Sequence, residues 1–442
     1  MQDRAAAHVS RRDFLASAGI ASASLATPIR MAAAEQETLA PLPPHPGGAP
    51  ERAASDEAHW RRVAAYYRVT DRVTNLEAGY WGMMATPVMD EYVGQIQRVN
   101  RENSFYARTA YAADLAAARA RVAAALGVDV GEIAFTRGAS EAMQCLIGNY
   151  SSLKPGDLVM YADLDYPAMQ DAMKWLTARH GVRVVRIVIP EPATRANVLQ
   201  TYADALKDNP GVRLLLLTHV NNKTGLVTPV ADVSRMARPQ GADVIVDAAH
   251  SFGQMDIKAR DLDADFIGFN LHKWIGAPVG VGAMYIRQAR LADFERDMGD
   301  EESPADSITS RVHSGTANFA TFLTVPAALD FHASIGPAYK AARVKYLRDR
   351  WVTAVRGVRG IDVLTPDDPQ MTAAITSFRL NGRTSKADND HIVQDLLTRF
   401  GLFTVRRTGI ERGDCVRVTP SLYNSVDDVD RLAAALKALA AA

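Results

Sequence analysis

Cysteine is scarce in this sequence: its 442 residues include only two, Cys145 and Cys415. Two cysteines cannot build a framework of several disulfides, and they do not supply the clustered ligands of a structural zinc site. The sequence therefore predicts no metal site. A single disulfide between the two stays open, and so does the interpretation of each as a small buried hydrophobic residue.

The sequence also has no excess of positive or negative charge and no long apolar run. Lysine plus arginine and aspartate plus glutamate number 50 each, and neither sign forms a long block. This balance predicts no nucleic-acid partner and no polybasic membrane patch. After the first 34 residues no run reaches the ~18 apolar residues that could span a bilayer, so we expect no permanent membrane anchor. With 48% hydrophobic residues the chain can bury a large core, and small molecules are the favoured partners.

The N-terminal residues resemble a twin-arginine export signal. Paired arginines open "SRRDFLASAGIASASLA" (10–26), and "MAAAEQ" (31–36) supplies small residues for cleavage after about residue 34. The resemblance implies export by the twin-arginine (Tat) machinery and a periplasmic location. That route carries folded proteins, often with a cofactor already inserted. The alternative is an alanine-rich tail with two accidental arginines.

The rest of the chain alternates helical and strand patterns, which predicts an α/β fold with a mainly parallel central sheet flanked by helices. Residues 112–127 form a strong helix candidate that ends at Gly127. Short apolar runs at 213–220, 242–250 and 265–270 are typical of central strands buried on both faces.

Composition and pattern also divide the chain. The sequence predicts a signal peptide, a flexible proline- and glycine-rich linker, an N-terminal segment, a large cofactor-binding domain and a smaller C-terminal α+β domain. Their expected boundaries are 1–34, 35–55, 56–85, 86–330 and 331–442.

One lysine stands in an otherwise apolar, glycine-rich run, "NLHKWIGAPVGVGAMYIR" (270–287). Lysine is rarely buried unless it is paired or used, although a snorkelling side chain is the common alternative. Asp247 ends another apolar strand pattern 26 residues before Lys273. This combination suits pyridoxal phosphate, since the amine can form an imine with the aldehyde and the carboxylate can pair with the pyridine nitrogen. A buried Asp–Lys ion pair is the alternative.

Three motifs follow one another along the chain, the first with Asp247 and the second with Lys273: "VDAAHSFGQMDI", "LDADFIGFNLHKWIGAPVGVG" and "GTANFATFLTVPAALDF". Together they resemble the class V (aspartate aminotransferase-like, fold type I) pyridoxal phosphate family, and its isopenicillin N epimerase-like branch most closely. The resemblance extends from about residue 70 onward. It implies pyridoxal 5'-phosphate as cofactor, Lys273 as the Schiff-base lysine, and a homodimer with a shared active site.

The resemblance assigns the phosphate to one set of residues. Ala139 and Ser140 open the helix in "FTRGASEAMQ" (135–144), where they would hold the phosphate, although a plain helix cap gives the same pattern. Asn270 and His272 match phosphate ligands on either side of the lysine. Thr316 in "RVHSGTANF" resembles the segment that reaches the phosphate of the neighbouring subunit.

The ring and the substrate have their own predicted contacts. The resemblance places Tyr166 over the ring, Asn222 on the substrate side and His250 at the ring oxygen, although the first two residue types are also common in turns. Arg417 would bind the amino-acid carboxylate with a two-pronged contact. The segment "TNLEAGYWG" (74–82) resembles the family's substrate loop, with contacts from Asn75 and Gly79. In the family two asparagines usually precede that glycine, whereas this chain has Asn75, Leu76 and Glu77.

The reaction stays open at this point. We expect an exported enzyme that acts on an amino acid or on the amino-acid part of a peptide, as exported relatives do in tailoring peptide siderophores such as pyoverdine. Bulky Tyr80, Trp81 and Trp274 near the motifs favour a large substrate. An aminotransferase or epimerase, a carbon-sulfur lyase and a non-catalytic ligand-binding relative are the alternatives. Sulfur transfer is disfavoured, because Cys145 and Cys415 fall on a predicted helix and strand rather than on a loop.

Overall fold

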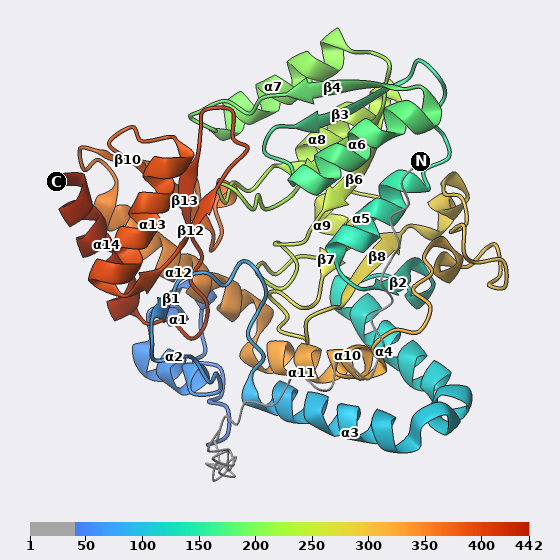
Figure 1. Ribbon diagram of the computed structural model, residues 1–442, viewed down its shortest axis with the longest axis horizontal. Helices are drawn as coiled ribbons and strands as arrows, with labels where there is room; N and C mark the ends of the chain where they lie inside the picture. Colours follow the sequence, from blue (N-terminus) through green and yellow to red (C-terminus); the bar gives the residue numbers. More distant parts are fainter. Residues whose placement is uncertain (1–39, 442) are drawn as a thin grey trace, which may run out of the picture. The chain divides into compact units, whose positions relative to one another are not determined.

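The computed structural model describes residues 40–441, and the predicted signal peptide lies outside the described residues. A seven-stranded sheet with the order β2-β8-β7-β6-β5-β3-β4 occupies the large part of the chain (Figure 1). Its strands are β2 (Ile133–Thr136), β3 (Leu158–Ala162), β4 (Arg183–Ile187), β5 (Val212–Thr218), β6 (Asp243–Asp247), β7 (Phe266–Asn270) and β8 (Gly282–Ile286). Every neighbouring pair is parallel except the two pairs formed by β8. The predicted α/β fold with a mainly parallel sheet is therefore confirmed.

Helices cover both faces of this sheet. The chain passes from β3 to β4 through α6 (Pro167–His180) and from β5 to β6 through α8 (Val230–Ala237), in opposite directions along the strand order. Because parallel crossovers are right-handed, the two helices lie on opposite faces. Strand β5 is accordingly buried on both sides, and Leu214 to Leu217 have no exposed surface. This double burial explains the continuous apolar runs in the sequence.

A second, antiparallel sheet with the order β12-β13-β10-β9 lies in the C-terminal part of the chain. Its strands are β9 (Ile361–Val363), β10 (Thr376–Leu380), β12 (Val405–Arg407) and β13 (Cys415–Val418). A hydrophobic core separate from that of the large sheet forms around Trp351 and Phe378, and Leu76 from the N-terminal segment joins it. From Pro41 onward the chain forms one compact unit, so the domain boundaries at 86–330 and 331–442 stay a prediction.

The N-terminal segment connects the two sheets. Strand β1 (Thr74–Asn75) pairs with β11 (Leu402–Phe403) beside the small sheet. A few residues later the Gly82 N–H donates to the His272 carbonyl, 2.8 Å away, next to the large sheet. A Cβ at position 82 would lie 1.7 Å from the Lys273 carbonyl oxygen, so only glycine fits there. This segment thus lies directly against the predicted cofactor lysine.

The remaining helices are α1 (Pro50–Ala53), α2 (Glu57–Ala64), α3 (Thr86–Thr109), α4 (Tyr111–Leu126), α5 (Ala139–Gly148), α7 (Arg195–Asp208), α9 (Ala259–Leu262), α10 (Phe319–Leu323), α11 (Val325–Ile335), α12 (Pro337–Val355), α13 (Lys386–Phe400) and α14 (Val426–Ala441). Helix α4 confirms the helix predicted at 112–127, since Gly127 ends it with a left-handed φ of 77°. Within residues 40–441, no helix is both long and apolar enough to cross a bilayer.

Candidate active site

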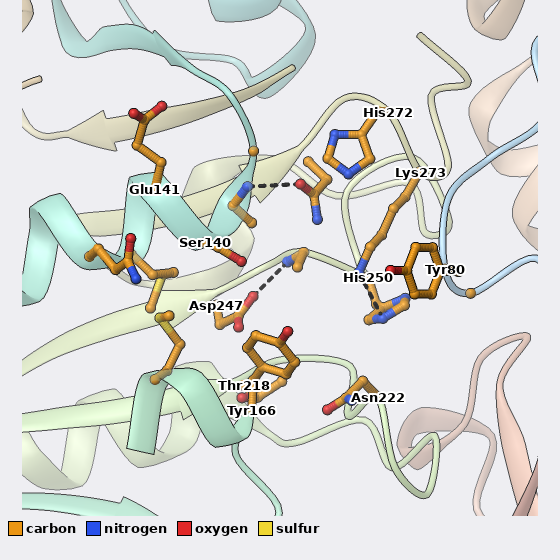
Figure 2. A pocket seen from close by; sticks show the side chains of 18 of the residues that line it. Tyr80, Ser140, Glu141, Tyr166, Thr218, Asn222, Asp247, His250, His272 and Lys273 are labelled. Atoms are coloured by element: carbon orange, nitrogen blue, oxygen red, sulfur yellow. Dashed lines mark hydrogen bonds between the residues drawn. The ribbon is translucent and has the colours of Figure 1, made fainter. Parts of the chain in front are cut away.

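A cavity of about 520 Å³ opens where strands β5, β6 and β7 end and helix α5 begins (Figure 2). Ligands of open α/β sheets bind at such carboxyl edges. Eleven of the thirteen predicted site residues line it: Gly79, Ala139, Ser140, Tyr166, Asn222, Asp247, His250, Asn270, His272, Lys273 and Arg417. The fold therefore brings together side chains from segments that lie far apart in the sequence.

Asp247 lies at the end of β6 and is buried in the floor of the cavity. Its Oδ1 accepts the Ala249 N–H at 2.9 Å. Burial raises the pKa of this carboxyl, while the Ala249 hydrogen bond and the charge of Lys273 lower it in part. A buried carboxylate gains most from a cationic partner, which a protonated pyridine nitrogen provides.

Lys273 and His250 form a hydrogen-bonded pair beside Asp247. Lys273 Nζ lies 3.1 Å from His250 Nε2, and Trp274 Nε1 donates to His250 Nδ1 at 3.4 Å. Burial and the charge of Lys273 hold the pKa of His250 well below its usual range, so the ring is neutral. Since the indole N–H can only donate, the proton of the neutral ring is on Nε2 and points at Nζ.

His250 Nε2 can donate to Nζ only in those molecules in which the lysine amine is neutral. Burial lowers the pKa of Lys273 to about 8, with Asp247 opposing the shift and Arg417 adding to it. The lowered pKa of Lys273 enlarges the fraction of neutral amine that can accept from His250. Lys273 has the properties of a nucleophilic amine rather than of a snorkelling surface lysine.

The N-terminus of α5 also borders the cavity and has features that suit an anion. His272 Nδ1 donates to the Val281 carbonyl at 2.7 Å, which leaves its Nε2 free for another partner. Gly138 precedes the helix, and a Cβ there would lie 3.2 Å from the His272 ring and 3.3 Å from Asn270 Oδ1. Such a close approach of backbone amides and polar side chains suits a phosphate group.

Two of the predicted phosphate contacts take a different form in the structure. The Ala139 N–H donates to Asn270 Oδ1 at 2.8 Å, so this amide and this side chain already bind each other. Asn270 therefore caps helix α5 from the neighbouring strand. Ser140, one residue further along, lines the cavity (Figure 2), and its contact with the phosphate stays a prediction.

Arg417 lies on β13 at the third side of the cavity and is only 1% exposed. Its Nη1 donates to the Asn222 carbonyl at 2.8 Å, and its Nη2 pairs with Glu77. Burial lowers the pKa of Arg417 to about 10, although Glu77 opposes the shift. A Cβ at Gly79 would lie 2.5 Å from Nη2, so glycine is required for the guanidinium group to lie here.

Comparison with known proteins identifies the family. The family model "Aminotransferase class-V" matches residues 84–432. The chain belongs to the class-V aminotransferase family. Isopenicillin N epimerase from Streptomyces clavuligerus is 26% identical over 86% of this chain and 98% of its own length. The epimerase from Amycolatopsis lactamdurans is 28% identical with the same coverage. A probable cysteine desulfurase from Vibrio cholerae is 28% identical over 72% of this chain and 81% of its own length.

Solved structures share the fold. The cysteine desulfurase CsdA from Escherichia coli has a TM-score of 0.72 at 21% identity and covers 86% of this chain and 98% of its own. The cystine C-S lyase C-DES has a TM-score of 0.71 at 22% identity, with coverage of 83% and 98%. The predicted fold type I architecture is thereby confirmed.

The residues present fit the cofactor of this family. Asp247 suits a protonated ring nitrogen, the N-terminus of α5 with His272 suits a phosphate, and Lys273 with its lowered pKa lies in the same cavity beside His250 (Figure 2). This class-V family member is therefore a pyridoxal phosphate-dependent enzyme. Among residues 40–441, no group of three or more His, Cys, Asp or Glu side chains could hold a metal ion.

Two predicted residues of this class-V enzyme lie outside the cavity. Asn75 lines a separate polar cleft with Asn424, and its Oδ1 accepts the Glu77 N–H at 2.9 Å. Thr316 is exposed and lines no part of the cavity in the single chain, so its predicted contact with a neighbouring subunit stays a prediction. Trp274 is buried and binds His250, so it does not border the substrate as expected.

Sequence reasoning missed two charged residues of the site. Arg407 on β12 lines the cavity, and Glu77 pairs with both Arg407 and Arg417. Glu77 carried a signal, because it stands where the family's substrate loop has an asparagine. Arg407 had none, since one arginine in the run "VRRTG" looks like any solvated arginine.

Neither cysteine lines the cavity, and the two are free thiols rather than a disulfide. Burial raises the pKa of both thiols to about 12. Cys415 also contacts the Lys223 carbonyl with its sulfur, at 3.6 Å. Because the thiolate is the nucleophile in sulfur chemistry, the raised pKa values disfavour both thiols as sulfur acceptors.

Proposed function

We propose that the enzyme moves a proton at the α-carbon of an amino-acid substrate, as an epimerase or an aminotransferase does. The observation that carries this proposal is the joint presence of Lys273 and Arg417 in one cavity. A lysine that can carry a proton and a buried guanidinium that can hold a carboxylate together define an α-amino acid. Pyridoxal phosphate, when bound, supplies the electron sink for this chemistry.

Each residue has a distinct part in the proposed reaction. With a pKa near 8, the Lys273 amine can accept a proton from the α-carbon and return it near neutral pH. His250 holds that amine through Nε2. Arg417 orients the substrate by its carboxylate, and Asp247 keeps a negative charge at the far end of the cavity.

The position of both thiols outside the cavity supports this reaction over sulfur transfer. The desulfurase relatives are similar in fold and sequence, but neither cysteine of this chain lines the cavity. The two isopenicillin N epimerases match over 98% of their own length, which favours chemistry at the α-carbon. A non-catalytic binding role would give no use to a lysine with a lowered pKa.

We further propose that the enzyme is exported to the periplasm by the Tat machinery and works on an amino-acid residue of a peptide, such as a siderophore precursor. The paired arginines and small residues of the N-terminus support export. Tyr80 lines the cavity and is 69% exposed, and Trp81 beside it is 52% exposed. An exposed aromatic side chain at the cavity with a second one beside it suits a substrate larger than a free amino acid.

A homodimer with a shared active site also belongs to this proposal. The exposed position of Thr316 outside its own cavity supports it. Sedimentation of the loaded enzyme tests this part directly, and a monomer at assay concentrations contradicts it.

Exchange in deuterated water tests the reaction. The loaded enzyme is incubated with L-amino acids and with glutamyl peptides that have a free amine, and the substrate is analysed by NMR and chiral chromatography. We expect deuterium at the α-carbon, with inversion for an epimerase or with a keto acid for an aminotransferase. Pyruvate with ammonia instead identifies a carbon-sulfur lyase, and release of elemental sulfur or sulfide with alanine identifies a desulfurase; either contradicts the proposal. The Lys273→Ala variant is the control and should show no exchange.

A further inference from the structure

Two arginines, not one, face the part of the cavity that we assign to the substrate carboxylate. Arg407 lies on β12 and Arg417 on the antiparallel neighbour β13, where Val405 is the partner of Arg417 in the register. Residues two apart on a strand share a face of the sheet, so Arg407 lies on the same face as Arg417. Both line the cavity.

Glu77 joins the two guanidinium groups. Its Oε1 accepts from Arg407 Nη2 at 3.2 Å and also from Arg417 Nη2. Glu77 is itself 8% exposed and does not line the cavity, so it binds the two arginines from within the protein. Two guanidinium groups and one carboxylate leave this trio with one net positive charge.

The trio is not saturated with hydrogen bonds. Nε of Arg407, Nε of Arg417 and Oε2 of Glu77 are all buried, and none has a hydrogen-bond partner. A buried donor without a partner costs stability. The charge that favours an anion here is the one positive charge left on the two arginines, which both line the cavity.

We propose that Glu77 is a positioning residue that holds Arg407 and Arg417 as one site with a single net positive charge, so that the site accepts one carboxylate. This inference rests on the proposed function and specifies its substrate class. The substrate has one free carboxylate beside the amine and no second carboxylate within reach of the arginines. A larger group at the β-carbon must be neutral or extend toward the open mouth of the cavity.

The reason is charge balance among buried side chains, since Glu77 and Arg417 are both buried. A first carboxylate neutralises the trio, whereas a second would stay buried without a counter-charge, which is unfavourable. Removing the charge of Glu77 changes the net positive charge of the trio from one to two. The site without a ligand then becomes less stable, because the two guanidinium groups repel each other. Binding of a second carboxylate becomes favourable.

Two probes measure how many carboxylates the site accepts. 2-Methylalanine has one carboxylate and 2-methylaspartate has two, and neither has the α-hydrogen that a proton transfer requires. Their dissociation constants are measured from the absorbance of the bound cofactor in the wild type, Glu77→Gln, Arg407→Gln and the double variant. Arg406→Gln is the matched control, because Arg406 is on the same strand but pairs with Asp390 and Asp414 instead.

We expect the ratio of 2-methylaspartate to 2-methylalanine affinity to rise about tenfold or more in Glu77→Gln, the fold-change of about 1.4 kcal/mol. Arg407→Gln should weaken the binding of 2-methylalanine by a similar factor, since the trio then has no net charge. The double variant restores one positive charge and should bind 2-methylalanine within about threefold of the wild type, a non-additive recovery. Arg406→Gln should match the wild type.

Thermal unfolding gives a second readout. Acetate should raise the melting temperature of Glu77→Gln more than that of the wild type. An unchanged affinity ratio together with an unchanged acetate response overturns the role of Glu77. If Glu77→Gln does not fold, the comparison of Arg407→Gln with the double variant decides. A double variant that binds 2-methylalanine no more tightly than Arg407→Gln overturns the role of Glu77. A protein that fails to bind pyridoxal phosphate at all would instead remove the proposed function.

Discussion

Lys273 should make the cofactor-free protein less stable at neutral pH than a variant without the amine. Burial lowers its folded-state pKa from 10.5 to about 8. Below pH 8 the amine is protonated in both states, and between 8 and 10.5 only the unfolded chain keeps the proton. The unfolded state thus binds more protons in that window, so this group's contribution to stability rises as the pH rises through it.

The magnitude follows from the two values. The difference between 10.5 and about 8 corresponds to about 3 kcal/mol at pH 7. This is an upper value, because Lys273 is partly exposed to the water of the cavity. The lowered pKa also leaves about a quarter of the amines neutral at pH 7.5, against roughly one in a thousand for an ordinary lysine.

The assay is denaturant unfolding of cofactor-free wild type and Lys273→Met between pH 7 and pH 10. At pH 7 we expect the variant to be more stable by up to about 3 kcal/mol from the removed charge, plus a pH-independent gain from the apolar methionine. The difference should shrink as the pH passes through 8 and approaches 10. A difference that stays constant over this range would refute the lowered pKa and the amine role built on it.

Three further predictions concern the site. Asp247→Asn should still bind pyridoxal phosphate, seen by absorbance, but lose at least about a hundredfold in deuterium exchange because the ring nitrogen loses its charged partner; near-normal exchange contradicts this. Gly79→Ala should raise KM for the substrate about tenfold or more while cofactor affinity holds, since the new Cβ displaces Arg417; an unchanged KM speaks against that contact. Cys145→Ser and Cys415→Ala should keep deuterium exchange within about threefold of the wild type, and loss of exchange at normal stability implicates a thiol.

The sequence was sufficient for those parts of the site that follow a strand. Asp247 and Lys273 come directly after apolar runs, and parallel strands place their carboxyl ends at one edge. Their proximity could therefore be predicted from order and pattern. The resemblance to a known family then added roles that the pattern alone could not give.

Contacts between distant segments could not be predicted in the same way. Asn75 was expected at the substrate, but it binds the Glu77 backbone and faces another cleft. Asn270 was expected at the phosphate, yet it caps helix α5 through Ala139. Such hydrogen bonds depend on distances of a few tenths of an ångström between elements, which no spacing along the chain encodes.

The pairing of Glu77 with Arg417 joins residues 340 positions apart, and this separation has a consequence for biosynthesis. A nascent chain that has left the ribosome through β8 already contains the lysine, the acid and the anion cradle. It lacks Arg407 and Arg417, the residues assigned to the substrate carboxylate, because β12 and β13 are still to be made. The carboxylate site is thus complete only after β13 has been made.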